Sequence, residues 1–148
     1  MSEDQSTVLL VEDEPLIRLF VAELLEESGF RVIEAANATE ALTILEAGRT
    51  VNVLLTDVDM PCGNNGFELA QKVCKCFPDI EILVLSGRRW PGGGDLPPGT
   101  AFLAKPCPNE AIVSHVQSAV LRAKQHSRPA DAQEELQSAD ILRFPKTA

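Results

Sequence analysis

The chain has 148 residues, with 13 basic and 22 acidic side chains and a formal net charge of −9. This length predicts one domain, and 45% hydrophobic with 24% charged residues is a globular composition. The acidic balance and the scarcity of aromatic residues argue against a nucleic-acid partner, which needs cations for phosphates and rings for stacking. No segment approaches the roughly 20 apolar residues of a membrane span, and the polar, acidic N-terminus is unlike a signal peptide. We therefore expect a cytoplasmic protein with no membrane partner, and reduced thiols because the four cysteines lack zinc-site spacing.

Five short apolar segments have the pattern of strands. Four are apolar at nearly every position, and the one at 31–35 alternates more; the five are 7–11, 31–35, 51–56, 80–85 and 101–104. Runs that are apolar throughout are typical of strands covered on both faces, as in a parallel sheet.

Segments of helical period separate most of these strands. The first begins at Pro15 and stops at Gly29, and we expect its apolar stripe to face the core. That stripe comprises Leu16, Ile17, Phe20, Val21, Leu24 and Leu25. A second helix is predicted from the cap Asn37, with Glu40 completing a variant capping box, to Gly48.

Two further helices are predicted, at 67–76 and from Pro108 onward. We expect the last helix to bury Ile112, Val113, Val116 and Val120. Strict alternation of strand and helix predicts an α/β fold with a doubly wound, five-stranded parallel sheet. Residues 87–99 hold five Gly and three Pro, so the fourth helix is expected to be short or replaced by a loop.

The character of the chain changes after about residue 125. We therefore expect one domain over residues 1–125 and a tail over residues 126–148. The tail is polar except for a small apolar group at 141–144, Ile-Leu-Arg-Phe. Two interpretations stay open: a frayed tail, or one that docks on this or another subunit.

Chemically distinctive residues follow the predicted strands. Glu12 and Asp13 follow the first, Asp57 follows the third, and Ser86 and Lys105 follow the last two. In an open parallel sheet, ligands bind at the carboxyl ends of the strands. Two carboxylates about 4 Å apart repel by roughly 4 kcal/mol at an effective dielectric of 20, so this cluster requires a proton or cation. Carboxylate oxygens suit Mg²⁺, and a lysine suits a phosphoryl oxygen.

The chain resembles the receiver domain of bacterial two-component response regulators over about residues 6–125. The matching segments, in family order and spacing, are 8–15 (VLLVEDEP), 54–61 (LLTDVDMP), the step Gly66-x-Glu68-Leu69, 84–87 (VLSG) and 102–106 (FLAKP). The resemblance implies a flavodoxin-like fold and a signalling domain rather than a turnover enzyme. It also implies phosphorylation of Asp57 by a sensor histidine kinase or histidine phosphotransfer protein.

The resemblance also implies a role for each site residue. Mg²⁺ would be held by Asp13, Asp57 and the main-chain carbonyl of Asp59, with Glu12 acting through a metal-bound water. The phosphoryl group would be bound by Lys105, which precedes a cis bond to Pro106, and by Ser86. Phe102 would rotate inward behind Ser86 as a switch. The phosphorylated surface would then bind an unidentified downstream protein, with homodimerisation as a further possibility. The remaining residues are too few for a DNA-binding output domain, so we expect a stand-alone receiver.

The sequence departs from the family pattern in four places. Glu12 stands where Asp is commoner, and Cys107 stands where an aromatic residue is usual. One extra residue lies between Pro61 and Gly66, and residues 87–99 lack the usual helix. Two other functions stay open: a phosphorylation-independent scaffold, and a phosphohydrolase, whose D-x-D pattern Asp57 and Asp59 fit.

Overall fold

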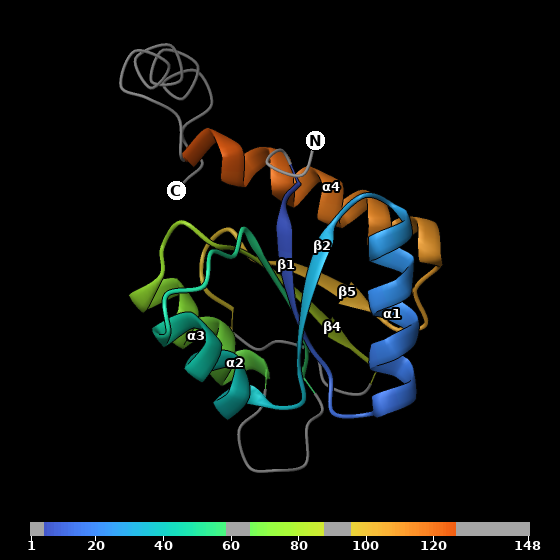
Figure 1. Ribbon diagram of the computed structural model, residues 1–148, viewed down its shortest axis with the longest axis horizontal. Helices are drawn as coiled ribbons and strands as arrows, with labels where there is room; N and C mark the ends of the chain where they lie inside the picture. The colour runs from blue at the N-terminus through green and yellow to red at the C-terminus, as the bar shows by residue number, and fades with distance from the viewer. Residues whose placement is uncertain (1–4, 59–65, 88–95, 127–148) are drawn as a thin grey trace.

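Five parallel strands form one sheet in the order β2-β1-β3-β4-β5 (Figure 1). The structure is a computed structural model that describes residues 5–58, 66–87 and 96–126. The strands are β1 (Thr7–Val11), β2 (Arg31–Ala35), β3 (Val53–Asp57), β4 (Glu81–Ser86) and β5 (Ala101–Ala104). The predicted doubly wound parallel sheet is therefore confirmed.

Four helices of the described chain cover the two faces of this sheet. They are α1 (Pro15–Glu27), α2 (Ala38–Glu46), α3 (Gly66–Cys76) and α4 (Asn109–His126). α1 and α4 pack on one face, whereas α2 and α3 pack on the other (Figure 1). This two-sided cover explains why every residue of β1 and β3 is buried and why those strands are apolar at nearly every position.

Helix boundaries follow from local capping. Pro15 is the first residue of α1, where a missing N–H costs nothing. At α2, Asn37 Oδ1 accepts the Glu40 backbone N–H at 2.8 Å, and Glu40 Oε1 accepts the Ala36 N–H at 2.7 Å. The predicted variant capping box is thus confirmed, with Ala36 rather than the cap residue as the return donor. Gly29 has φ +99°, the left-handed conformation in which glycine ends a helix.

The burial predicted for α1 is wrong over its N-terminal half. Val21 and Leu25 are buried, but Leu16, Ile17 and Phe20 are 76%, 43% and 55% exposed. Periodicity identifies the residues that share a helix face, not how far the neighbouring elements extend over that face. In α4, Ile112, Val116 and Val120 are buried as predicted, whereas Val113 is only half-buried.

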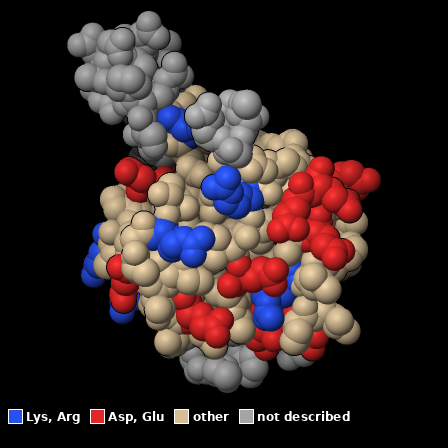
Figure 2. All heavy atoms as spheres, viewed as in Figure 1, with Lys and Arg blue, Asp and Glu red and all other residues tan. Residues whose placement is uncertain are grey.

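The acidic C-terminal end of α1 faces solvent. Glu23, Glu26 and Glu27 are all exposed. Figure 2 shows acidic side chains gathered at the upper right, on the side where α1 lies in Figure 1. Within the described chain, no helix is both long and apolar enough to cross a bilayer.

The connection between β4 and β5 contains no helix at its described positions, 87 and 96–100. Residues 88–95 lie outside the described chain, so the full prediction for 87–99 is met only at its two ends. α4 extends to His126, and residues 127–148, most of the predicted tail, also lie outside the described chain.

Candidate functional site

Four of the predicted site residues meet at the carboxyl edge of the sheet: Glu12, Asp13, Asp57 and Lys105. β1 and β3 are neighbours in the sheet although β2 lies between them in the chain, so the strand order reverses beside β1. Glu12 and Asp13 follow β1, and Asp57 ends β3. A reversal of this kind places the two loops on either side of a crevice, which is where ligands of such sheets bind.

Three carboxylates lie together at this reversal. One oxygen from each of Glu12, Asp13 and Asp57 lies within 4.8 Å of the others. Glu12 is 5% exposed and Asp57 is 4% exposed, whereas Asp13 is half-buried. Burial weakens the screening of their mutual repulsion by water, so the cluster is suited to a bound cation.

Lys105 supplies one positive charge to this cluster. Its Nζ lies 3.0 Å from Asp57 Oδ1 and 3.8 Å from Glu12 Oε1. The Lys105 backbone N–H donates to the Ser86 carbonyl at 2.8 Å, which anchors the start of the loop to the end of β4. The peptide bond from Lys105 to Pro106 is cis, as the resemblance implies.

The carboxyl group of Glu12 is strongly perturbed. Burial raises its pKa to about 7, and the charges of Asp57 and Asp13 also raise it. The Glu14 backbone N–H, which donates to Glu12 Oε2 at 3.1 Å, and Lys105 both act in the opposite direction. Near neutral pH, and without a cation, about half of the molecules therefore carry a proton on Glu12.

Ser86 and Phe102 lie on the neighbouring strands. Ser86 is the last residue of β4 and is 3% exposed, so it lies buried at the same edge as the acidic cluster. Phe102 aligns with Val84 in the β4–β5 pairing, is half-buried, and packs against the core on the α2 and α3 side. Ser86 thus lies one strand beyond Asp57 at the same edge, whereas Phe102 lies two strands beyond it and in the core.

Two residues that shape the site were not predicted to do so. Arg18 Nη1 donates to the Glu12 carbonyl at 2.8 Å, and its Nε pairs with Glu34 at 3.2 Å, which fixes the loop after β1. A Cβ on Gly66 would lie 2.9 Å from Val58 Cα and would also clash with the Asp57 carbonyl. The motif around Gly66 was noticed in the sequence, but this close approach of α3 to Asp57 requires the fold.

Asp59 and the extra residue between Pro61 and Gly66 lie outside the described chain. The described carboxylates by themselves are chemically suited to Mg²⁺. Magnesium prefers oxygen ligands and commonly binds one or two carboxylates together with phosphate and water. Glu12, Asp13 and Asp57 offer such oxygens within one ion's reach.

Comparison with known proteins agrees with this geometry. The family model described as "response regulator receiver domain" matches residues 8–91, which is more than half of the chain. The chain belongs to the receiver domain family. Receiver domains act mainly in two-component signalling, and the acidic cluster fits a phosphorylation site.

Curated relatives place such domains in proteins of several kinds. The chain is 41% identical to the sensor kinase CckA of Brucella abortus over 55% of its own length, but this covers 9% of that kinase. It is 31% identical to the regulator PhyR of Methylorubrum extorquens over 89% of its length and 50% of PhyR. With the receiver protein CpdR of Brucella abortus it shares 29% identity over 78% of its length and 98% of CpdR. The chain thus spans half or less of the first two relatives.

Solved receiver structures superpose well on this fold. A receiver protein from Sinorhizobium medicae matches with a TM-score of 0.75 at 22% identity, covering 82% of this chain and 98% of the other. The receiver domain of the hybrid histidine kinase CckA matches with a TM-score of 0.66 at 32% identity, covering 78% and 99%. The first match supports the fold alone, and the second also supports the family relationship.

Proposed function

We propose that Asp57 accepts a phosphoryl group from a sensor histidine kinase or a histidine phosphotransfer protein, and that this switches a protein-binding surface. The observation that carries the proposal is the placement of the buried Asp57 carboxylate. It lies within one ion's reach of Glu12 and Asp13 and 3.0 Å from the Lys105 ammonium. A carboxylate so placed has a cation in contact with it and two further acids that could hold a metal ion with it.

The proposed transfer is a substitution at phosphorus. An Asp57 carboxylate oxygen forms a bond to phosphorus while the bond from phosphorus to the donor's imidazole nitrogen breaks, and that nitrogen keeps the electron pair and takes a proton. Bound Mg²⁺ would neutralise charge on the phosphoryl oxygens. Asp13 and Asp57 would hold the ion directly, with the Asp59 carbonyl, and Glu12 would hold it through water.

Three residues would stabilise the product. Lys105 is already in contact with Asp57 and would move its ammonium group onto a phosphoryl oxygen. Ser86, buried at the end of the adjacent strand, would donate its hydroxyl to another. Phe102, half-buried behind this edge, would follow Ser86 inward and change the surface there. The added charge of about −1.5 to −2 biases the equilibrium between the two surfaces.

The proposal is tested by incubating the full chain with Mg²⁺ and a small acyl phosphate. We expect a mass gain of one phosphoryl group that hydroxylamine removes, as an acyl phosphate requires. Asp57→Asn should abolish the gain, while Asp79→Asn, which changes an exposed acid outside the site, should leave it unchanged. No labelling of the wild-type chain would favour the scaffold function, and labelling that survives in Asp57→Asn would reject Asp57 as the acceptor.

A further inference from the structure

A largely apolar pocket lies between α1 and α4, directly beside the acidic cluster. It has a volume of about 480 Å³. Ile17 and Phe20 of α1 form one wall, and Cys107 and Ile112 form the other. The inner end of the pocket is closed by Glu12, Asp57 and Lys105. An occupant would therefore need an apolar surface and a group compatible with carboxylates.

The walls of this pocket are apolar side chains in contact with solvent. Ile17 is 43% exposed and Phe20 is 55% exposed, although the periodicity of α1 places them on its core-facing stripe. Cys107, on the other wall, is half-buried. Covering such a surface is favourable by about 25 cal/mol for each Å² of apolar area removed from water.

The chain itself contains a segment with the matching chemistry. Residues 141–144, Ile-Leu-Arg-Phe, are the apolar group in an otherwise polar stretch that follows α4. Its three apolar side chains suit the walls of the pocket. Arg143 suits the inner end, where the two acids Glu12 and Asp57 face one lysine, Lys105, among the described lining residues.

The length of the intervening chain allows this contact. α4 begins beside the pocket at Asn109 and has 18 residues, so its C-terminal end lies about 27 Å away at 1.5 Å per residue. Residues 127–140 separate that end from the apolar group. A segment of this length has a root-mean-square span of about 20 Å and an extended reach of about 46 Å, so it can return along α4.

We propose that residues 141–144 bind in the pocket between α1 and α4 of their own chain. The apolar side chains cover Ile17 and Phe20, and Arg143 lies toward the acidic cluster. The tether gives the segment an effective concentration on the order of 1 mM, so an intrinsic dissociation constant on the order of 0.1 mM produces roughly 90% occupancy. The argument for this contact does not depend on the proposed phosphorylation of Asp57.

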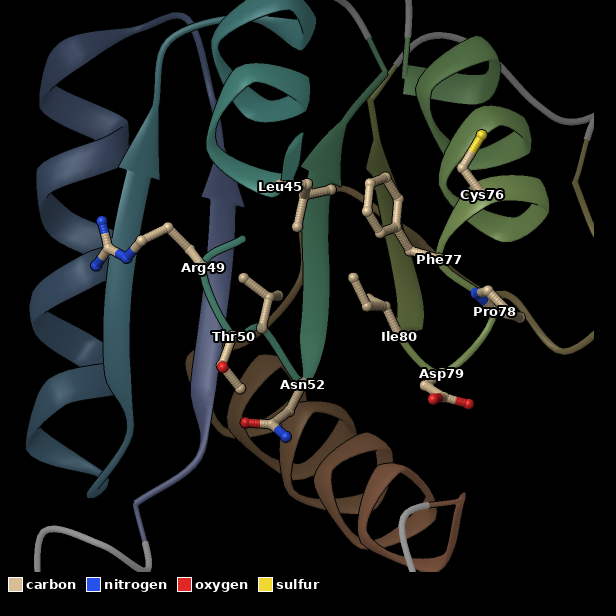
Figure 3. A pocket seen from close by; sticks show the side chains of 10 residues that line it. Leu45, Arg49, Thr50, Asn52, Cys76, Phe77, Pro78, Asp79 and Ile80 are labelled. Atoms are coloured by element: carbon tan, nitrogen blue, oxygen red, sulfur yellow. The ribbon is translucent and has the colours of Figure 1, made fainter. Parts of the chain in front are cut away.

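A second pocket, of about 420 Å³, lies at the opposite end of the strands and does not offer the same match (Figure 3). Its polar residues do not converge: the side chains of Arg49 and Asp79 point in different directions in Figure 3. Asn52 is used structurally, because its Oδ1 accepts the Thr7 backbone N–H at 2.8 Å. Cys76 also lines this second pocket and provides an internal reference thiol for the experiment.

The experiment measures the alkylation rate of each cysteine in the full chain by peptide mass spectrometry after a pulse of N-ethylmaleimide. Burial raises the pKa of the Cys107 thiol, so all variants are compared at one pH. We expect Leu142→Asp with Phe144→Asp to accelerate alkylation of Cys107 about tenfold, as 90% occupancy requires. The rate at Cys76 should not change.

Matched variants separate docking from a general change in the tail or fold. Ala130→Asp with Ala132→Asp adds the same charge elsewhere in the tail and should leave Cys107 protected. On the pocket side, Phe20→Asp should accelerate alkylation, whereas Leu121→Asp, at a 62% exposed position outside the pocket, should not. Circular dichroism checks that each variant is folded.

Two results would overturn the proposal. The first is an equal Cys107 rate in the wild-type chain and the Leu142→Asp, Phe144→Asp variant, which would leave the pocket open to a separate partner. The second is protection of Cys107 from alkylation that increases with protein concentration, together with a dimer in sedimentation. That result would mean that residues 141–144 of a second copy bind in the pocket. Protection that is independent of concentration and lost in both the tail and Phe20→Asp variants supports the proposal.

Discussion

We predict that Mg²⁺ binds about tenfold more weakly at pH 6 than at pH 8, and that Glu12 causes the difference. Burial raises the pKa of Glu12 to about 7. A cation at the cluster requires the ionised carboxylate, so the ion competes with the proton. With a pKa near 7, the fraction of protonated Glu12 is about 0.9 at pH 6 and about 0.1 at pH 8, which gives a ratio of about 10 in apparent affinity.

Isothermal titration calorimetry in two buffers of different ionisation enthalpy measures both the affinity and the number of protons released. We expect about 0.9 proton released for each Mg²⁺ bound at pH 6 and about 0.1 at pH 8. Glu12→Gln keeps the shape of the side chain but cannot ionise, so its affinity should be nearly constant over this range. Asp79→Asn, an exposed acid outside the cluster, should retain the wild-type dependence.

This reasoning would be refuted by a wild-type affinity that does not change between pH 6 and pH 8. It would also be refuted if Glu12→Gln kept the full tenfold dependence, because the titrating group would then be a different residue. A weaker affinity of Glu12→Gln at all pH values is compatible with the reasoning, since the substitution also removes one negative charge.

Three further outcomes follow from the structure. Without divalent cations, the free energy of unfolding should fall by up to about 3 kcal/mol as the pH rises from 4.5 to 7. The reason is that the pKa of Glu12 is about 7 in the folded chain against 4.5 for the ordinary group, so the folded state binds more protons in this range. Urea unfolding at pH 5 and pH 8 should show this loss in the wild-type chain and not in Glu12→Gln. Gly66→Ala should lower the free energy of unfolding by about 1–3 kcal/mol and slow phosphorylation of Asp57, since the new Cβ would lie 2.9 Å from the Val58 backbone. Gly87→Ala should lower it less, because its Cβ would lie at an ordinary 3.5 Å from Lys105. Equal stabilities of the two variants would contradict this reasoning. Leu54→Ala, in the fully buried core, should cost about 2–5 kcal/mol by urea unfolding, and Leu121→Ala, on the surface, less than about 0.5 kcal/mol.

The sheet could be predicted from the sequence because strands covered on both faces are apolar at nearly every position. The predicted bounds of β1, β2 and β5 agree with the structure, whereas β3 begins at Val53 rather than two residues earlier. There the Asn52 side chain accepts the Thr7 backbone N–H, a contact at the end of the strand that hydrophobicity does not encode.

The convergence of Glu12, Asp13, Asp57 and Lys105 also followed from the sequence, because parallel strands bring their carboxyl ends to one edge. The contact of Arg18 with the Glu12 carbonyl was not predictable in the same way. It depends on the angle at which α1 leaves β1, and no spacing rule encodes that angle. The roles of the four converging residues in phosphoryl transfer are proposals, and the labelling experiment tests the role of Asp57.

The pocket and the acidic cluster share Glu12, Asp57 and Lys105, so events at one are physically linked to the other. Phosphorylation would draw the Lys105 ammonium toward the phosphoryl oxygens and add negative charge at the inner end of the pocket. Arg143 of a docked segment would then bind more tightly or less tightly than before. Binding equilibria are reciprocal, so the docked segment must change the stability of the phosphorylated state by the same factor. The equilibrium constant for hydrolysis of the Asp57 acyl phosphate can be compared between the wild-type chain and the Leu142→Asp, Phe144→Asp variant. If the two values were identical, the pocket and the acidic cluster would be energetically independent although they are adjacent.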